Sequence, residues 1–555
     1  MTHSIFYHVP PKKYFKAHPD WFTMDASGRR VSDRQLCFSS AAMKAEFERN
    51  FIAHVAAKGG RGVFDVTAQD LPGDFCSCAE CRAASSKFGS VGAAYYLFVR
   101  HLAGVMRERF PEAILHFSAY RVGQTEVPPN AAFGRFPDNC ALVFAPIDND
   151  FSKTYLHPAN RPHLENFRAW GRIVPRLWEW YYPLPYGDRA PFAGVRRTAE
   201  DLKTAYGAGL TGGTFEHDVG TRIGAGFADL HTYMISRLFC DPETPWRPVA
   251  EEFCRLYYGA AADMVLSYMD ELDALAESAH VPLVWNGGLD AVGEAGFLFK
   301  WNAAFDKAEG LVAGDARLVQ RLRECRLSLE SATVSNWRKL VAAGKAPAAS
   351  PKVVADRALA TCRAAVDRRF TLSAKVANQF YEKYAAPMRD ALHRATVVAK
   401  PLPPQFASLP ERDIIDILVK PTQGAKSRRD SDAAIGIACY DPRHFEKPLK
   451  KYEVGFFDRE AKRHFPRRTI SREEVVPDKY HFYKIGTYEI SRDCLLWFSW
   501  TWRLQQELGK FWEPGGEGRW EVYASLKLEG PFFSDKSRSR ENGVSLDRIV
   551  LVRTK

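Results

Sequence analysis

The sequence contains no uninterrupted apolar run of the ~18 residues that a transmembrane helix needs, so we expect no membrane span. Its first residues lack a basic stretch followed by an apolar one, so no secretory signal is recognisable and localisation stays unassigned. Three catalytic motifs are also missing: the G-x-x-x-x-G-K-[ST] phosphate loop, the H-E-x-x-H zinc motif and the G-x-S-x-G nucleophile elbow. The commonest NTPases, zinc peptidases and serine hydrolases are therefore excluded, and no cofactor is expected.

The cysteines are few and odd in number, 11 among 555 residues, which argues against a disulfide framework. Cys76, Cys78 and Cys81 form a C-x-C-x₂-C motif, and Cys37 is a candidate fourth member. Four thiolates can hold a structural zinc ion tetrahedrally. Because this spacing is tighter than the usual C-x₂-C pair, unligated thiols are the favoured interpretation, with zinc and a disulfide as alternatives.

The charge is unbalanced toward basic residues, with 77 Lys and Arg against 66 Asp and Glu, a net charge of +11. The clearest basic runs lie late in the chain, at 426–429, 447–451 and 462–468. No nucleic-acid-binding motif accompanies them, so a solvated surface is expected and nucleic acid is not an expected partner. Aromatic residues make up 13% of the chain, which suits clefts that stack on sugar rings, although most aromatics fill cores.

Residues 1–245 alternate short apolar runs with amphipathic stretches, which predicts a parallel sheet with helices outside it. The expected strands are Ser4–His8, Gly62–Val66, Ile114–Ala119, Ala141–Pro146, Arg176–Trp180 and Gly213–Glu216. The expected helices are Ala41–Lys58, Gly92–Arg109, Leu164–Trp170, Thr198–Tyr206 and Phe227–Leu238. Six strands are two short of a (β/α)₈ barrel, so we expect a TIM-like barrel domain that lacks its first two βα units.

The rest of the chain changes character twice. Residues 246–404 show helical periodicity and end at a Pro401-Leu-Pro-Pro404 breaker, which predicts a helical domain. Residues 405–555 contain short strand-like runs, which predict an antiparallel β-sandwich that could bind carbohydrate. These runs are Ile414–Val419, Ala434–Cys439, Tyr480–Ile485, Leu495–Trp500, Trp520–Leu528 and Ile549–Val552.

Carboxylates lie at the ends of three of the expected parallel strands: Asp65 and Asp70 at or just past the end of Gly62–Val66, Glu179 within Leu177–Tyr182, and Glu216 at the end of Gly213–Glu216. The carboxyl ends of parallel strands meet on one face of a barrel, where reacting groups are found. Glycoside hydrolysis uses two carboxyl groups, and aromatic surroundings raise the pKa of the one that acts as the acid. We therefore predict that Asp70, Glu179 and Glu216 are catalytic.

Neighbouring side chains are candidates for binding substrate. Trp178, Trp180 and Tyr181 flank Glu179 and offer stacking surfaces. The other candidates are His8 at the end of the first expected strand, His217 next to Glu216, and Asp148 after the fourth expected strand. A histidine at a strand end can equally be a structural hydrogen-bonding group, and Glu179 could instead pair with an arginine such as Arg176.

Six segments, in order across roughly residues 5–270, together resemble the family catalogued as domain of unknown function 4838, which is linked to glycoside hydrolase family 163. They are His18–Phe22, Gln35–Cys37, Gln69-Asp70 with Cys76–Cys81, Trp178–Trp180 with Pro183 and Pro185, Gly213–Glu216, and Tyr257–Ala261. Two positions depart from the family's usual pattern. The family has Asp where this chain has Glu179, and Gln-Gly where it has His217-Asp218.

The resemblance implies a TIM-like barrel that hydrolyses β-linked N-acetylglucosamine in complex N-glycans, with retention of configuration and assistance by the substrate's acetamido group. By position, Asp70, Glu179 and Glu216 match the family's carboxylates. A glycan or glycoprotein is thus the expected partner. The alternatives are a non-catalytic glycan-binding protein and an inactive truncated hydrolase. If two strands precede this chain, Gly62–Val66 becomes the fourth barrel strand and Glu179 ends the seventh, where many barrel glycosidases keep their acids.

Overall fold

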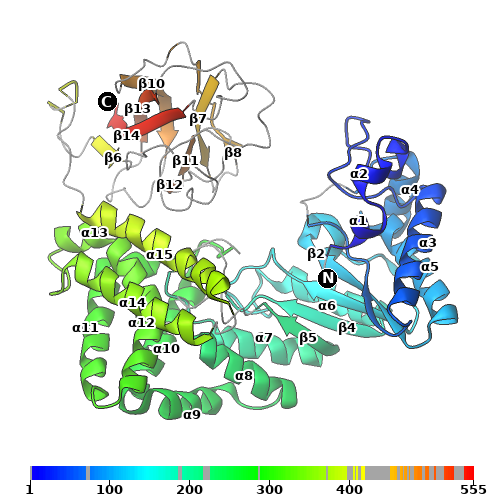
Figure 1. Ribbon diagram of the computed structural model, residues 1–555, viewed down its shortest axis with the longest axis horizontal. Helices are drawn as coiled ribbons and strands as arrows, with labels where there is room; N and C mark the ends of the chain where they lie inside the picture. Colours follow the sequence, from blue (N-terminus) through cyan, green and yellow to red (C-terminus); the bar gives the residue numbers. More distant parts are fainter. Residues whose placement is uncertain are drawn as a thin grey trace. The chain divides into compact units, whose positions relative to one another are not determined.

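The computed structural model describes residues 3–70, 75–184, 190–216, 226–284, 288–369 and 373–396, and from there on 404–406, 408–409, 414–418, 451–458, 463–466, 468–471, 474, 481–490, 494–498, 506–507, 518–529 and 543–554. The chain divides into two compact units, whose helices and strands are labelled in Figure 1. The first contains Met1–Ala332 and Thr361–Ala374, and the second contains Thr333–Ala360 and Lys375–Lys555. The expected three-domain division stays a prediction.

Five parallel strands form the sheet of the first unit, in the order β1-β2-β3-β4-β5. They are β1 (Gly62–Asp65), β2 (Ala113–Tyr120), β3 (Cys140–Ala145), β4 (Arg176–Tyr181) and β5 (Leu210–Phe215). Parallel neighbours in chain order require crossovers, which are right-handed and so place all the crossover helices on one face. The α/β sheet is confirmed. A closed barrel is not, because β1 and β5 are the edges of this row of strands.

The helices that cover this sheet match the periodicity of the sequence. Five of them were expected: α3 (Ala41–Ala57), α5 (Ala93–Arg109), α6 (Arg161–Ile173), α7 (Val195–Gly207) and α8 (Ala228–Cys240). Between them, α5 packs on β2, α6 on β4 and α7 on β5. The first unit also contains shorter elements: α1 (Ile5–His8), α2 (Pro11–Tyr14), η1 (Pro19–Trp21), α4 (Ala79–Phe88), the π-helix η2 (Arg121–Glu126) and η3 (Ala131–Phe133).

The expected strand at Ser4–His8 is wrong, because Ile5–His8 forms the short helix α1. Ile5 and His8, three residues apart, are buried, while Tyr7 between them is exposed. That spacing is helical, and four residues were too few to distinguish it from a strand. The strand count therefore falls to five, and the numbering that made Gly62–Val66 fourth and Glu179 seventh no longer holds.

The middle of the chain is helical, as predicted. Its elements are α9 (Trp246–Tyr258), η5 (Gly259–Ala261), α10 (Ala262–Ser278), η6 (Asp290–Gly293), α11 (Ala295–Leu311), α12 (Ala316–Ser335), α13 (Trp337–Ala342), α14 (Pro351–Arg369) and α15 (Ala374–Thr396). Among the described residues, no helix combines the length and the apolar character needed to cross a membrane.

The C-terminal part is built from antiparallel strands in two sheets, with orders β10-β13-β14-β6 and β12-β11-β7-β8, and β9 pairs with β7. The strands are β6 (Ile414–Leu418), β7 (Lys451–Asp458), β8 (Arg463–His464), β9 (Arg468–Ser471), β10 (His481–Ile490), β11 (Cys494–Phe498), β12 (Gln506–Glu507), β13 (Gly518–Glu529) and β14 (Gly543–Arg553). This layout is compatible with a sandwich. The expected strand at Ala434–Cys439 lies outside the described residues.

Candidate functional site

The two faces of strand β4 differ in burial. Along β4, Leu177, Glu179 and Tyr181 are buried, whereas Arg176, Trp178 and Trp180 are partly exposed. Side chains alternate between faces along a strand, so the buried set lies under the helices and the other set lies on an open face. The register continues this division, since Trp180 pairs with Thr214 and Tyr181 with Phe215. Glu216, two residues beyond Thr214, belongs to the open face, opposite to Glu179.

Glu179 lies in the buried layer with only 2% of its surface exposed. The Tyr155 hydroxyl donates a hydrogen bond to Oε1, and Oε2 has no hydrogen-bond partner among the described residues. Burial raises the pKa of Glu179 to about 8. The hydrogen bond from Tyr155 opposes the rise, the nearby Asp201 carboxylate adds to it, and Arg197 opposes it least. The side chain is therefore mostly protonated at neutral pH.

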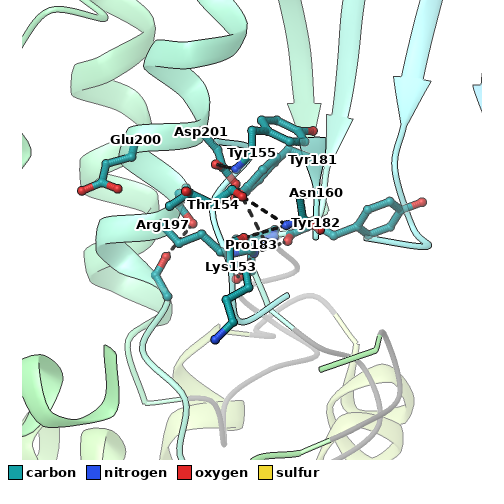
Figure 2. Close-up of polar contacts among 12 residues, drawn as sticks. Lys153, Thr154, Tyr155, Asn160, Tyr181, Tyr182, Pro183, Arg197, Glu200 and Asp201 are labelled. Carbon is teal, nitrogen blue, oxygen red and sulfur yellow. Dashed lines mark hydrogen bonds and ion pairs between the residues drawn. The ribbon is translucent and has the colours of Figure 1, made fainter. Parts of the chain in front are cut away.

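Asp201, on α7, completes this buried cluster. The Tyr181 hydroxyl donates to Oδ2 at 2.7 Å and the Tyr155 amide donates to Oδ1 at 2.6 Å. Burial raises the pKa of Asp201 to about 6, although the neighbouring Arg197 guanidinium opposes the rise. Figure 2 shows Tyr155 and Tyr181 turned toward Asp201, while the Tyr182 ring points the opposite way. Tyr181 and Tyr182, which are adjacent in the sequence, thus point to different faces of the sheet.

Arg197 connects the buried cluster to the segment that follows β4. Its Nη2 donates to the carbonyl oxygens of Tyr182 at 2.7 Å and Pro183 at 3.0 Å. Its Nη1 lies 4.0 Å from Oδ2 of Asp201, and its guanidinium carbon is 5.1 Å from the Tyr181 ring centroid. The buried layer therefore holds in place the backbone from which Tyr182 projects.

The open face carries Glu216 at the carboxyl edge of the sheet. The Trp180 indole N–H donates to Oε2 of Glu216 at 2.7 Å, and the Glu216 amide donates to the Tyr181 carbonyl at 2.8 Å. The pKa of the Tyr182 hydroxyl is raised, mainly by burial and then by Tyr120, Glu216 and Asp70. Tyr120 is the last residue of β2, and Asp70, Tyr182 and Glu216 follow β1, β4 and β5, so all four lie at the carboxyl edge of the parallel sheet.

Asp70 is exposed and lies beside Tyr120, the last residue of β2. Burial raises the pKa of Tyr120 to about 12, and the Asp70 carboxylate contributes to the rise both through its charge and as a hydrogen-bond acceptor. Arg121 opposes this effect. Asp70 and Glu216 thus border the same buried tyrosines, Tyr120 and Tyr182, which makes this edge the candidate active site.

Arg121 was not singled out from the sequence, although it lies two residues past the end of the expected strand Ile114–Ala119. Its backbone has φ = 59°, a left-handed conformation that is uncommon for residues other than glycine. It opens the π-helix η2, an element often found at functional sites. Its Nη1 lies 3.5 Å from Oδ1 of Asp148, and Oδ2 of Asp148 accepts the Val122 amide at 3.0 Å. Asp148 therefore lies at the same edge of the sheet and contacts Arg121 and Val122, the first residues of η2.

Three further candidates have different surroundings. Trp178 lies deeper on the open face, its ring 6.1 Å from that of His116, whose Nδ1 is 2.9 Å from Oδ1 of Asp65. His8 does not end a strand. It is buried with its ring 4.9 Å from that of Phe47, and burial is the main reason why its pKa is lowered to about 4. His217 and Pro185 lie outside the described residues.

A cavity of about 50 Å³ beside the buried cluster, lined in part by Lys153 and Arg197, is a poor alternative site. Lys153, labelled in Figure 2, donates from Nζ to the carbonyl oxygens of Ala276 and Ala279, both at 3.0 Å, and to that of Glu277. These carbonyls lie at the end of α10, where a cation is favourable. The cavity is also much smaller than the ~300–1,000 Å³ typical of ligand pockets.

The structure therefore brings Asp70, Asp148, Trp180 and Glu216 to one edge and places Glu179 and Tyr181 in the buried layer behind the sheet. No curated protein matches this sequence. A family model does match its first part, up to the end of the motifs noted in the sequence. Residues 1–270 match the family described as "Domain of unknown function (DUF4838)", which supports the family that those motifs indicated.

Proposed function

We propose that this chain is a glycoside hydrolase that acts on N-acetylglucosamine-containing glycans, with retention of configuration and assistance by the substrate. The observation that carries the proposal is the hydrogen bond of 2.7 Å between the Trp180 indole and Glu216, at an edge that also holds Asp70. Two carboxyl groups among aromatic rings are what hydrolysis of a glycosidic bond requires. The resemblance to glycoside hydrolase family 163 suggests the substrate class, and the sheet is proposed to be part of a TIM-like barrel.

The side chains at this edge have different proposed roles in the reaction. Glu216, half-buried against Trp180, is the proposed general acid that protonates the leaving oxygen. The Asp70 carboxylate is proposed to orient the substrate's acetamido group, whose oxygen attacks the anomeric carbon. Trp180, which is partly exposed, offers a ring surface to the sugar, and Asp148 holds the segment that begins with Arg121 at the rim.

Glu179 acts differently in this proposal. Its carboxyl group lies on the opposite face from Trp180, bonded to Tyr155, so it does not reach a sugar on the open face. We assign it a positioning role, because the same cluster holds Tyr181 and, through Asp201 and Arg197, the segment that carries Tyr182. The resemblance to the family places a carboxylate at this position, and the geometry suggests that it supports the site from behind.

The test is cleavage of the chitobiose core of a complex N-glycoprotein, followed by mass spectrometry of the released glycan. Glu216→Gln and Asp70→Asn should each lower turnover ~10²- to 10⁴-fold, the range expected for loss of a positioned acid or base. Glu165→Gln on the exposed surface of α6, and Asp138→Asn before β3, serve as matched controls and should retain activity.

Unchanged turnover in Glu216→Gln would refute its assignment as the acid. If the wild-type chain binds the glycan but never cleaves it, the non-catalytic glycan-binding alternative holds instead. Both outcomes are read against unchanged melting temperatures, so that loss of activity is not confused with loss of fold.

A further inference from the structure

The four cysteines of the sequence motif converge on one point, although they come from separate stretches of the chain. Cys37 precedes α3, Cys76 and Cys78 precede α4, and Cys81 lies in the first turn of α4. All four are buried, and their sulfur atoms lie within 4.8 Å of one another. We call this group the cysteine cluster.

The sulfur–sulfur distances match those around a tetrahedral metal ion. Sγ of Cys37 lies 3.5 Å from that of Cys76 and 3.8 Å from that of Cys78. A disulfide requires about 2.05 Å, so these pairs are not bonded to each other. Four sulfurs at the usual Zn–S distance of ~2.3 Å stand ~3.8 Å apart at the corners of a tetrahedron. The cluster therefore has the dimensions of a zinc–thiolate site.

Hydrogen-bond donors surround these sulfurs, as expected around thiolates that bind a metal. The Met24 amide and Nη1 of Arg30 point at Sγ of Cys76, at 3.3 Å and 3.5 Å. The Ser39 hydroxyl lies 2.8 Å from Sγ of Cys81. Because a buried thiolate needs a compensating positive charge, these donors indicate a cluster built to carry negative charge rather than four neutral thiols in a core.

We propose that Cys37, Cys76, Cys78 and Cys81 bind one structural zinc ion. Four protein sulfurs fill a tetrahedral shell and leave no position open for water or substrate, so the ion stabilises the fold and takes no part in a reaction. Its ligands join the loop before α3 to the start of α4. This assignment revises the expectation of unligated thiols, because the sequence spacing could not show how closely Cys37 approaches the other three.

The site also fixes the segment that leads to Asp70. The Gln35 side chain, two residues before Cys37, donates to the Gln69 carbonyl at 3.1 Å and accepts from the Gln69 amide at 2.9 Å. Zinc would therefore stabilise this pair of hydrogen bonds, because Cys37 lies near Gln35 in the sequence and Cys76 follows Gln69. The consequence for Asp70 rests on the proposed function, whereas the zinc site itself does not.

The first experiment measures metal in the full chain, produced in zinc-supplemented medium and purified without chelator, by elemental analysis. We expect one zinc per chain in the wild type and in Cys240→Ser, a control that changes an exposed cysteine outside the cluster. Cys37→Ser and Cys78→Ser should lose most of the zinc. Iron in place of zinc, or full zinc content in both cluster variants, would overturn the proposal.

The second experiment uses the wild-type chain alone, so that a misfolded variant cannot decide the result. A thiol-blocking mercurial should release one zinc per chain, and replacement by cobalt should give the visible absorption of tetrahedral cobalt–thiolate. Metal-free protein whose cluster thiols all react freely would refute the site, as would thiols that appear only after reduction, which would indicate disulfides. Neither measurement depends on turnover, so failure of the glycosidase proposal leaves this result intact.

Discussion

Two glutamates on opposite faces of the parallel sheet, Glu179 in β4 and Glu216 directly after β5, lie in opposite environments. On the covered face, Glu179 is 2% exposed and hydrogen-bonded to Tyr155. At the edge of the open face, Glu216 is partly exposed and accepts the Trp180 indole N–H at 2.7 Å. An acidic residue among aromatics therefore has two distinct uses in this protein, and the face on which it lies decides between them.

Glu179, the glutamate on the covered face, should make the free energy of unfolding depend on pH. We expect this effect to be the largest of those described below. The pKa of Glu179 is about 8 in the fold against 4.5 for the ordinary group. Between these values the folded chain keeps a proton that the unfolded chain has released, so stability falls as pH rises, by at most ~1.4 kcal/mol per pH unit. Asp201 acts in the same direction up to about pH 6.

Glu179→Gln keeps the shape and a neutral side chain, so it should remove this dependence. We expect the melting temperature of the variant to exceed that of the wild type at pH 8 and to approach it at pH 5. Thermal unfolding at pH 5, 6.5 and 8 measures this, with Glu165→Gln as the exposed control. Parallel pH curves for wild type and Glu179→Gln would show that Glu179 is ionised in the fold and would remove the distinction between the faces.

The open face is tested by removing the indole donor. Trp180→Phe keeps a ring on the open face but takes away the hydrogen bond to Glu216. Hydrogen bonds to charged groups contribute ~1.5–3 kcal/mol, so glycan turnover should fall about ten-fold or more, with the alkaline limb of the pH profile displaced. Trp246→Phe, at the start of α9, is the matched control. A drop in turnover with an unchanged pH profile would indicate lost stacking rather than an altered Glu216.

The sequence predicted the positions of the strands better than it predicted which face of each strand is covered by helices. A short apolar run predicted a strand at Arg176–Trp180, close to the bounds of β4, but Trp178 and Trp180 on one side are as aromatic as Tyr181 on the other. Neither set stands out as the core, so the covered face emerged only from the packing of α7 and its Asp201. The expected aromatic surroundings of Glu179 are present, yet they are Tyr155 and Tyr181 rather than the tryptophans.

Other parts of the site depended on contacts distant in sequence. The carboxyl ends of the strands predicted that Asp70, Asp148 and Glu216 share an edge, because parallel strands end together. The cysteine cluster depends on Cys37, which is 39 residues from Cys76 and 41 from Cys78, and no local pattern joins them. The helix at Ile5–His8 was missed because so short a segment gives too little periodicity.

The smallest effect concerns the rim, where Arg121 keeps a left-handed backbone at the end of β2. A non-glycine residue in this region costs ~1–2 kcal/mol, which Arg121→Gly would recover, offset by the flexibility of glycine and by the lost ion pair with Asp148. We therefore expect a melting temperature within about 2 °C of the wild type, with turnover several-fold lower. Arg121→Lys, which keeps both charge and backbone cost, is the matched comparison and should be the less stable of the two. If the glycine variant is the less stable of the two, the contacts with Asp148 outweigh the backbone cost. The role of Arg121 would then be structural, like that of the buried residues around Glu179.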